Sequence, residues 1–178
     1  MDFNDVIKAR RSIRKFDPSK QVSVDAAREL ISSAQYAPSW KNSQTARYYC
    51  VLSSEAIEEF RANCLPEFNA TNSHGASYIV TTFVKDRSGF DRDGNATNEC
   101  GNGWGYYDLG LANENLVLKA TDMGLDTLIM GIRDEKIIRT MLNIPENEII
   151  VSVIAVGYRL ANPEMPKRRD IDTIVNFY

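Results

Sequence analysis

Two short apolar segments place the strongest constraint on how this chain can fold. Residues 77–84 read SYIVTTFV and residues 149–157 read IIVSVIAVG. Both are rich in β-branched or aromatic residues, and both are far shorter than the roughly 20 residues that a bilayer-spanning helix needs. The two segments therefore predict buried strands of a sheet, and they argue against a membrane protein.

Helical periodicity surrounds these strands. Apolar residues follow helical spacing after Ser23, an expected N-cap, until Pro38 ends the pattern. A second amphipathic pattern runs from Leu109 to Met123 and stops before Gly124. The sequence also predicts helices over 2–11, from 54 onward and over 134–142, and strands over 47–52 and 126–131.

These elements predict one α+β domain over residues 1–178, a length at which a core can form without disulfides. The tail 158–178 has no apolar periodicity of its own. The least regular stretch, 86–105, contains five glycines. A loop this long inside a domain is usually functional or disordered, so we expect either a lid carrying Phe90 and Trp104 or a mobile surface loop.

Composition narrows the functional classes. A net charge of −3 offers no general attraction for nucleic acid. The three cysteines lack a C-x-x-C spacing, and the N-terminus has no signal-peptide pattern, which indicates reduced thiols and a cytoplasmic location. The single histidine, His74, excludes a multi-histidine metal site and is expected in a turn or on the surface.

Positive charge is concentrated near the N-terminus of this acidic chain. The segment KARRSIRKF, residues 8–16, carries five cations, and a second basic triplet spans 167–169. Arginine forks suit phosphate, and Ser12 would add a neutral donor, so the two clusters together could bind one small phosphate. The alternative is a solvated helix face.

A polar connector, PSWKNSQTA, precedes the strand expected at 47–52. It is either a plain polar loop or a place for ligand contacts.

Four segments in order resemble the FMN-dependent nitroreductase family. They are RRSIRKF, APSWKNSQTARYYCV, GYYDLGLANENLVLKATDMGLDTLIMG and KRRDIDTIV, and together they span nearly the whole chain. The resemblance implies a nitroreductase-like fold with a mixed, mostly antiparallel central sheet flanked by helices. It also implies an intertwined homodimer with FMN at the interface and a C-terminal tail that crosses to the partner.

The resemblance also implies roles for individual residues at the phosphate end of the flavin. Arg14 would lie beside the flavin N1–O2 edge, where a fixed cation favours the reduced, anionic ring. The expected phosphate and ribityl contacts are Arg10, Arg11, Ser12, Lys167, Arg168 and Arg169.

At the ring, the resemblance implies contacts from a segment, an amide and a backbone turn, and the segment is expected to come from the partner subunit. The segment from the partner would present Pro38, Ser39 and Asn42. The amide is that of Asn69, on the pyrimidine edge, and the turn supplies the backbone N–H groups of Met130 and Gly131 to N5 and O4.

The activity implied is an NAD(P)H oxidoreductase that reduces nitroaromatics, quinones or similar electron-poor acceptors in a ping-pong cycle. Since the flavin carries the chemistry, no side chain need act as a nucleophile.

Three departures from the family pattern concern the substrate pocket: Thr45 where proline is common, the bulky pair Trp40-Lys41, and Met130 in place of a glycine or acidic residue. Three alternatives therefore stay open. They are another reaction of the same flavin superfamily, a flavin-binding or sensing protein whose ring is crowded by Met130 and Trp40, and an anion-binding scaffold without flavin.

Overall fold

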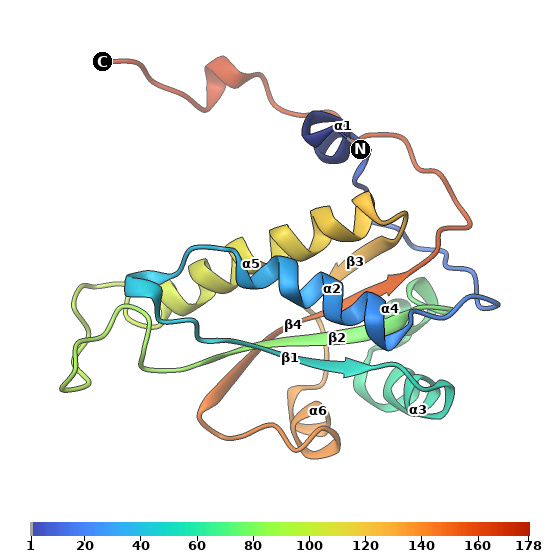
Figure 1. Ribbon diagram of the computed structural model, residues 1–178, viewed down its shortest axis with the longest axis horizontal. Helices are drawn as coiled ribbons and strands as arrows, with labels where there is room; N and C mark the ends of the chain where they lie inside the picture. Colours follow the sequence, from blue (N-terminus) through green and yellow to red (C-terminus); the bar gives the residue numbers. More distant parts are fainter. Residues whose placement is uncertain (1) are drawn as a thin grey trace.

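The computed structural model describes residues 2–178 (Figure 1). Within them lies one sheet with strand order β1-β2-β4-β3, in which every neighbouring pair is antiparallel. The strands are β1 (Ala46–Val51), β2 (Ser77–Val84), β3 (Asp126–Met130) and β4 (Glu148–Gly157). The helices are α1 (Phe3–Ala9), α2 (Val24–Gln35), α3 (Ser54–Cys64), α4 (Glu67–Asn72), α5 (Gly103–Asp122) and α6 (Glu135–Met141), with short 3-10 turns η1 (Trp40–Asn42) and η2 (Ile171–Thr173).

The sheet forms the middle of three layers. On one face α2 and α5 pack against side chains such as Ile79 and Ile154, and on the other face α3 and α6 pack against side chains such as Val80 and Val153. The central strands β2 and β4 are therefore buried on both faces, which explains why their sequences are apolar without alternation. The predictions of buried strands over 77–84 and 149–157 and of an α+β fold are confirmed.

An extended segment continues the sheet beyond β3. The Ile13 N–H donates to the Thr127 carbonyl at 3.0 Å, and the Leu160 N–H donates to the Lys15 carbonyl at 2.9 Å. Ile13 and Phe16 turn into the core, whereas Arg14 and Lys15 are exposed. The basic segment is thus held along the sheet at its backbone, with Arg14 and Lys15 facing outward and Arg10 and Arg11 half-buried.

Several predicted boundaries need correction. The helix expected over 2–11 ends at Ala9, because the backbone that follows pairs with the sheet; Lys8 is the one cation of the basic segment that lies on a helix. Helix α4 follows Pro66 and was not predicted. Helix α5 begins at Gly103, inside the stretch expected to be a loop.

The C-terminal tail has no packing pattern, as expected. Residues 162–174 are exposed, and the ribbon leaves β4, passes α1 and ends away from the body (Figure 1). Across residues 2–178 we find no helix with the length and apolar character required to cross a bilayer. His74 lies exposed in a turn, as predicted, and all three cysteines are free thiols.

Helix α5 lies very close to the Phe83 side chain of β2 at Gly105. A methyl group there would lie 2.2 Å from the Phe83 ring. We expect Gly105→Ala to lower the free energy of unfolding by about 1–3 kcal/mol, as overpacking does. The matched change Gly103→Ala, whose added methyl meets Cys100 at an ordinary 3.5 Å, should leave stability unchanged or raise it by up to about 1 kcal/mol. Urea unfolding of both variants measures the difference, and equal losses would contradict the close approach.

Tyr48 on β1 carries a buried hydroxyl that has no hydrogen-bond partner among residues 2–178. Burial raises the pKa of Tyr48 to about 12, whereas an unfolded tyrosine titrates near 10. Between these values the unfolded chain releases a proton that the folded chain keeps. The free energy of unfolding therefore falls, by up to about 1.4 kcal/mol per pH unit, as pH rises from about 10 to 12.

We expect Tyr48→Phe to keep or slightly raise stability at pH 7, because an unsatisfied buried hydroxyl is removed. The same variant should lose less stability than the original protein between pH 10 and 12. Chemical unfolding followed at both pH values tests this. A loss above about 1 kcal/mol at pH 7 would show that the hydroxyl has a stabilising partner.

Candidate functional site

The cations of the N-terminal segment have no acidic partners among residues 2–178, although Arg10 and Arg11 are half-buried. No ion pair within residues 2–178 involves Lys8, Arg10, Arg11, Arg14 or Lys15. The nearest acid in sequence is already engaged, because Asp17 accepts hydrogen bonds from Ser19 and pairs with Lys20. These contacts, the Ser19 bonds foremost, hold the pKa of Asp17 below its ordinary value.

The guanidinium groups are therefore available to an anion from solution. Arg11 is the most constrained of them, since its Nη1 donates to the carbonyls of Lys8 and Arg10 while its Nε is buried without a partner. The backbone of Ser12 forms a β-bridge with Thr127 at the beginning of β3, and the Ser12 side chain is exposed. The explanation of the cluster as a charged helix face is wrong for Arg10, Arg11 and Arg14, which lie outside α1.

Asn69, Met130 and Gly131 come together at the other end of β3. The Asn69 side chain is buried, and its Nδ2 donates to the Ile132 carbonyl at 2.8 Å. The Arg133 Nη1 donates to the Gly131 carbonyl at the same distance. The turn that follows β3 is thus held from two sides, by α4 and by Arg133.

Met130 differs from expectation in where its side chain lies. It is 3% exposed and packs in the core with α3 and α6 rather than projecting at the surface. Its backbone pairs with Val153 of β4. The backbone carbonyl of Thr127 points the other way, to the outer edge of the sheet, where it accepts from the Ile13 N–H. Because successive strand residues face opposite edges, the Met130 amide points toward β4.

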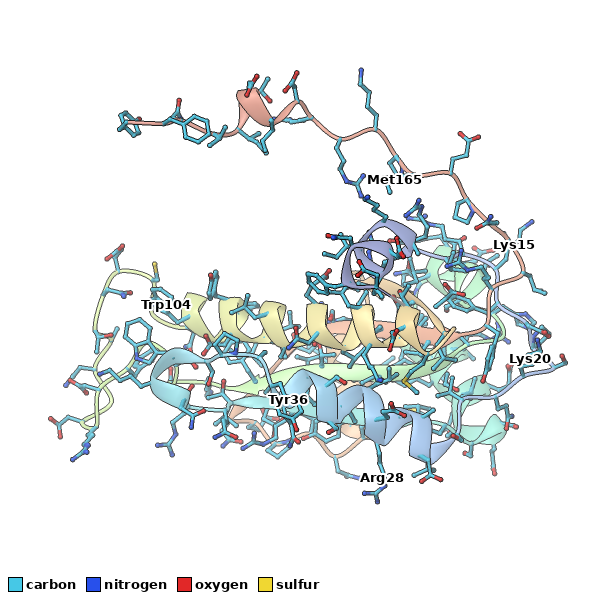
Figure 2. All side chains as sticks on the ribbon, turned by 45° about the horizontal axis from the view of Figure 1, so that its top comes forward. Lys15, Lys20, Arg28, Tyr36, Trp104 and Met165 are labelled. Atoms are coloured by element: carbon cyan, nitrogen blue, oxygen red, sulfur yellow. The ribbon has the colours of Figure 1, made fainter. Side chains whose placement is uncertain are left out.

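Pro38, Ser39 and Asn42 lie far from these residues. The Trp40 N–H donates to Asp108 at 2.9 Å, which places η1 beside the first turns of α5, and Ala37 packs with the α2 and α5 side of the sheet. Met130 packs on the opposite side, and β3 begins after the last turn of α5. Helix α5 has 20 residues and is about 30 Å long. Figure 2 shows Trp104 and Lys15 at opposite ends of the molecule. Within one chain the structure does not bring the two sets of predicted residues together.

The third predicted set is also apart. Lys167, Arg168 and Arg169 lie in the exposed tail, where Arg168 donates to the Pro166 carbonyl. No hydrogen bond or ion pair in residues 2–178 joins them to residues 10–14. The convergence of the two basic clusters is therefore not seen within a single chain.

The segment around η1 has an unusual backbone. Lys41, Asn42 and Gln44 all adopt positive φ, at 47°, 56° and 48°. Left-handed conformations at residues other than glycine cost on the order of 1–3 kcal/mol each and persist only where surrounding contacts impose them. One such contact is local, since the Gln44 N–H donates to Ser39 Oγ at 3.1 Å.

A cavity of about 330 Å³ lies behind this segment. It is bordered by α2, β1 and α5, and the Tyr48 and Asp108 side chains line it. Pro38 and Ser39 form part of its wall.

Residues 86–102 form an ordered loop beside η1. The Thr97 N–H and hydroxyl both donate to the Gly89 carbonyl at 2.8 Å, and Asp86 and Asn102 exchange hydrogen bonds of the same length. The Trp104 ring at the beginning of α5 packs against the Trp40 ring in a tilted arrangement, with centroids 4.6 Å apart. The loop therefore has a defined internal structure and a contact with η1. Its role as a lid stays a prediction.

Sequence reasoning missed two groups that position these segments. Asp108 is a buried carboxylate bonded to Trp40 and Ser88, and Arg133 braces the turn after β3. Asp108 had a detectable signal, because it falls on the apolar stripe of α5 together with Leu109 and Ala112. Arg133 had no signal in the sequence.

The comparisons with known proteins agree with this fold. A Bacillus subtilis protein named as an NAD(P)H nitroreductase, YdgI, is 34% identical over 83 residues, which are 47% of this chain and 39% of that protein. The CLA biosynthesis enone reductase of Lactiplantibacillus plantarum is 28% identical over 99% of this chain and 94% of its own length.

A structure from Exiguobacterium sibiricum, solved in complex with FMN, matches with a TM-score of 0.80 at 20% identity and covers all of this chain and 98% of that one. The family model of the Nitroreductase family matches residues 7–158. The chain belongs to the Nitroreductase family.

Proposed function

We propose that this chain is an FMN-dependent NAD(P)H oxidoreductase that reduces nitroaromatics, quinones or similar electron-poor acceptors. The observation that carries the proposal is the row of unpaired cations on residues 10–14, held in extended backbone beside β3. Family membership and the FMN complex of the Exiguobacterium protein support the choice of ligand.

The donor set fits a flavin phosphate. Arg10 and Arg11, with the Ser12 hydroxyl, offer charged and neutral donors, and no carboxylate of residues 2–178 competes for them through an ion pair. Arg11 would offer its Nη2 to a phosphate, because its Nη1 is bound to backbone carbonyls and its Nε is buried. Arg14, exposed on the same strand, would place its charge beside the N1–O2 edge of the ring.

The other end of β3 fits the ring. Asn69 Nδ2 donates to the Ile132 carbonyl, which leaves Asn69 Oδ1 as an acceptor. An acceptor suits the N3–H of a flavin pyrimidine. Gly131 lies just past the strand, and its carbonyl is bound by Arg133. With the Met130 amide facing β4, we expect Gly131 rather than Met130 to offer a backbone donor to the ring.

A homodimer would complete the site. Pro38, Ser39 and Asn42 lie about one length of α5 from residues 10–14, so they would reach the flavin held by a partner. The exposed tail carries Ile171, Ile174 and Phe177, apolar side chains that a partner subunit would cover. We propose that Lys167, Arg168 and Arg169 reach a phosphate in the same way.

Bound FMN would supply hydride transfer from NAD(P)H to the acceptor. The chain's part is to bind the phosphate, orient the ring against the end of β3 and hold a cation at its anionic edge. We propose that donor and acceptor use one site in turn. The enone reductase among the relatives extends the acceptor class to conjugated enones. One reason to consider a flavin-binding protein without turnover was that Met130 could crowd the ring. This reason is weakened because the Met130 side chain is buried in the core.

A visible absorption spectrum of the purified, desalted protein tests the proposal. Flavin bands that bleach on anaerobic addition of NADH or NADPH are expected. A colourless protein that stays colourless after incubation with FMN would refute the cofactor assignment. Flavin bands that neither nucleotide bleaches would refute the enzyme and leave a flavin-binding protein.

The division of roles among the arginines is testable. Combining Arg10→Ala with Arg169→Ala should weaken FMN binding at least tenfold, because two charge-assisted phosphate contacts are lost. Arg14→Ala should instead slow hydride transfer about tenfold and spare most binding. FMN fluorescence titration and stopped-flow reduction measure these effects. Arg28→Ala, an exposed arginine on α2, serves as the control (Figure 2). Equal flavin loss in both variants would contradict the assignment.

The tail should matter for assembly rather than for the fold of one chain. Because residues 162–174 are exposed, we expect deletion of residues 163–178 to leave the helical circular dichroism unchanged. The same deletion should convert a dimer to a monomer in analytical ultracentrifugation and reduce FMN retention at least tenfold. A truncated chain that still sediments as a dimer with full flavin would contradict the crossing tail.

A further inference from the structure

We propose that Asp108 is a positioning residue that holds segment 38–44 in the conformation in which it meets the flavin of a partner subunit. The second half of this statement rests on the proposed function, since it takes segment 38–44 as part of the flavin site. The first half concerns the chain alone and can be tested without flavin.

Asp108 reaches the segment by two routes. Its Oδ2 accepts from the Trp40 N–H at 2.9 Å and from the Ser88 hydroxyl at 2.6 Å. The Ser88 Oγ in turn lies 2.7 Å from Ser43 Oγ. Because Ser88 has one hydroxyl proton and gives it to the carboxylate, Ser43 is the donor in the second contact. One carboxylate oxygen thus binds Trp40 directly and reaches Ser43 through the Ser88 hydroxyl.

A buried carboxylate is an unusual group at the position of Asp108. Asp108 is 6% exposed, and no ion pair within residues 2–178 compensates its charge. Burying a charge without a cation is costly unless strong hydrogen bonds satisfy it. The donors that satisfy it here belong to η1 and to loop 86–102. The buried carboxylate therefore fixes these two segments relative to α5.

The segment held in this way could not keep its shape alone. Lys41, Asn42 and Gln44 are all left-handed, and Lys41 and Asn42 are exposed, so few contacts of their own side chains impose this backbone. The anchors on either side are the Trp40 bond to Asp108, the Ser43 bond to Ser88 and the packing of Trp40 on Trp104. Releasing Asp108 removes the Trp40 bond and frees Ser88, the hydroxyl through which Ser43 is held.

Exposed Lys41 provides a direct probe, because trypsin cleaves after lysine and needs a locally opened backbone. We expect Asp108→Asn to speed cleavage after Lys41 at least tenfold in the flavin-free protein, followed by mass spectrometry of the fragment that ends there. Ser88→Ala should speed it several-fold. Glu148→Gln is the matched control, since Glu148 is a buried carboxylate that accepts from Tyr49 and Thr82 and does not contact segment 38–44.

The second arm uses the protein loaded with FMN. If the held segment meets the flavin, Asp108→Asn should raise the FMN dissociation constant and change the visible circular dichroism of the bound ring, while Glu148→Gln changes neither. A purely structural role would lower the melting temperature of both variants alike and leave the ring signal unaltered. Ser88→Ala keeps the test available if Asp108→Asn does not fold.

The outcomes separate the two claims. Cleavage after Lys41 that is no faster in Asp108→Asn and Ser88→Ala than in Glu148→Gln overturns the positioning role. Faster cleavage with an unchanged flavin signal supports the positioning role and overturns its connection to the site. Failure of the unaltered protein to bind FMN refutes the proposed function and that connection together, while the cleavage rates still decide whether Asp108 holds the segment.

Discussion

Burial of β2 and β4 on both faces is the constraint on which the rest of the molecule depends. Helices α2 and α5 cover one face, and α3 and α6 cover the other, so the middle of the sheet has no access to water. The polar side chains in this middle, such as Thr81, Ser152 and Asn113, bond to one another, so the polar groups considered for a ligand lie at the rims of the sheet and at the ends of α5. The basic segment and the turn after β3 lie along one rim, and η1 with loop 86–102 lies at the opposite end of α5.

This separation has a functional consequence. A helix of 20 residues stands between segment 38–44 and the cations of residues 10–14, and no side chain can bridge that distance within the chain. A site that needs both sets must take them from two copies, in which case folding, assembly and cofactor binding would be coupled. The exposed, partly apolar tail is consistent with a chain whose surface is completed by a partner.

Much of the fold was predictable, because the spacing of apolar residues and the local composition indicate the helices and strands. The strands at 77–84 and 149–157 stand out because they are short, β-branched and continuous, and the predicted elements at 47–52, 126–131 and 134–142 agree with β1, β3 and α6 to within a residue or two. The failures occurred where long-range pairing overrode local preference. Residues 10 and 11 were expected to continue the first helix, but α1 ends at Ala9, and the chain leaves it to bond with β3 through the Ile13 N–H and the Thr127 carbonyl. The short helix α4 has too few residues to show a period.

The sequence by itself determined the fold class, the family resemblance and the chemical types available for a phosphate and a ring, because these reside in residue identity and order. Only the tertiary structure decided which of those residues share one end of the molecule. It showed that the Met130 side chain belongs to the core and that the Asn69 amide nitrogen donates to a backbone carbonyl. It also showed that the buried Asp108 carboxylate accepts a hydrogen bond from the backbone of η1. Such facts depend on distances between segments far apart in the chain, which no local pattern encodes.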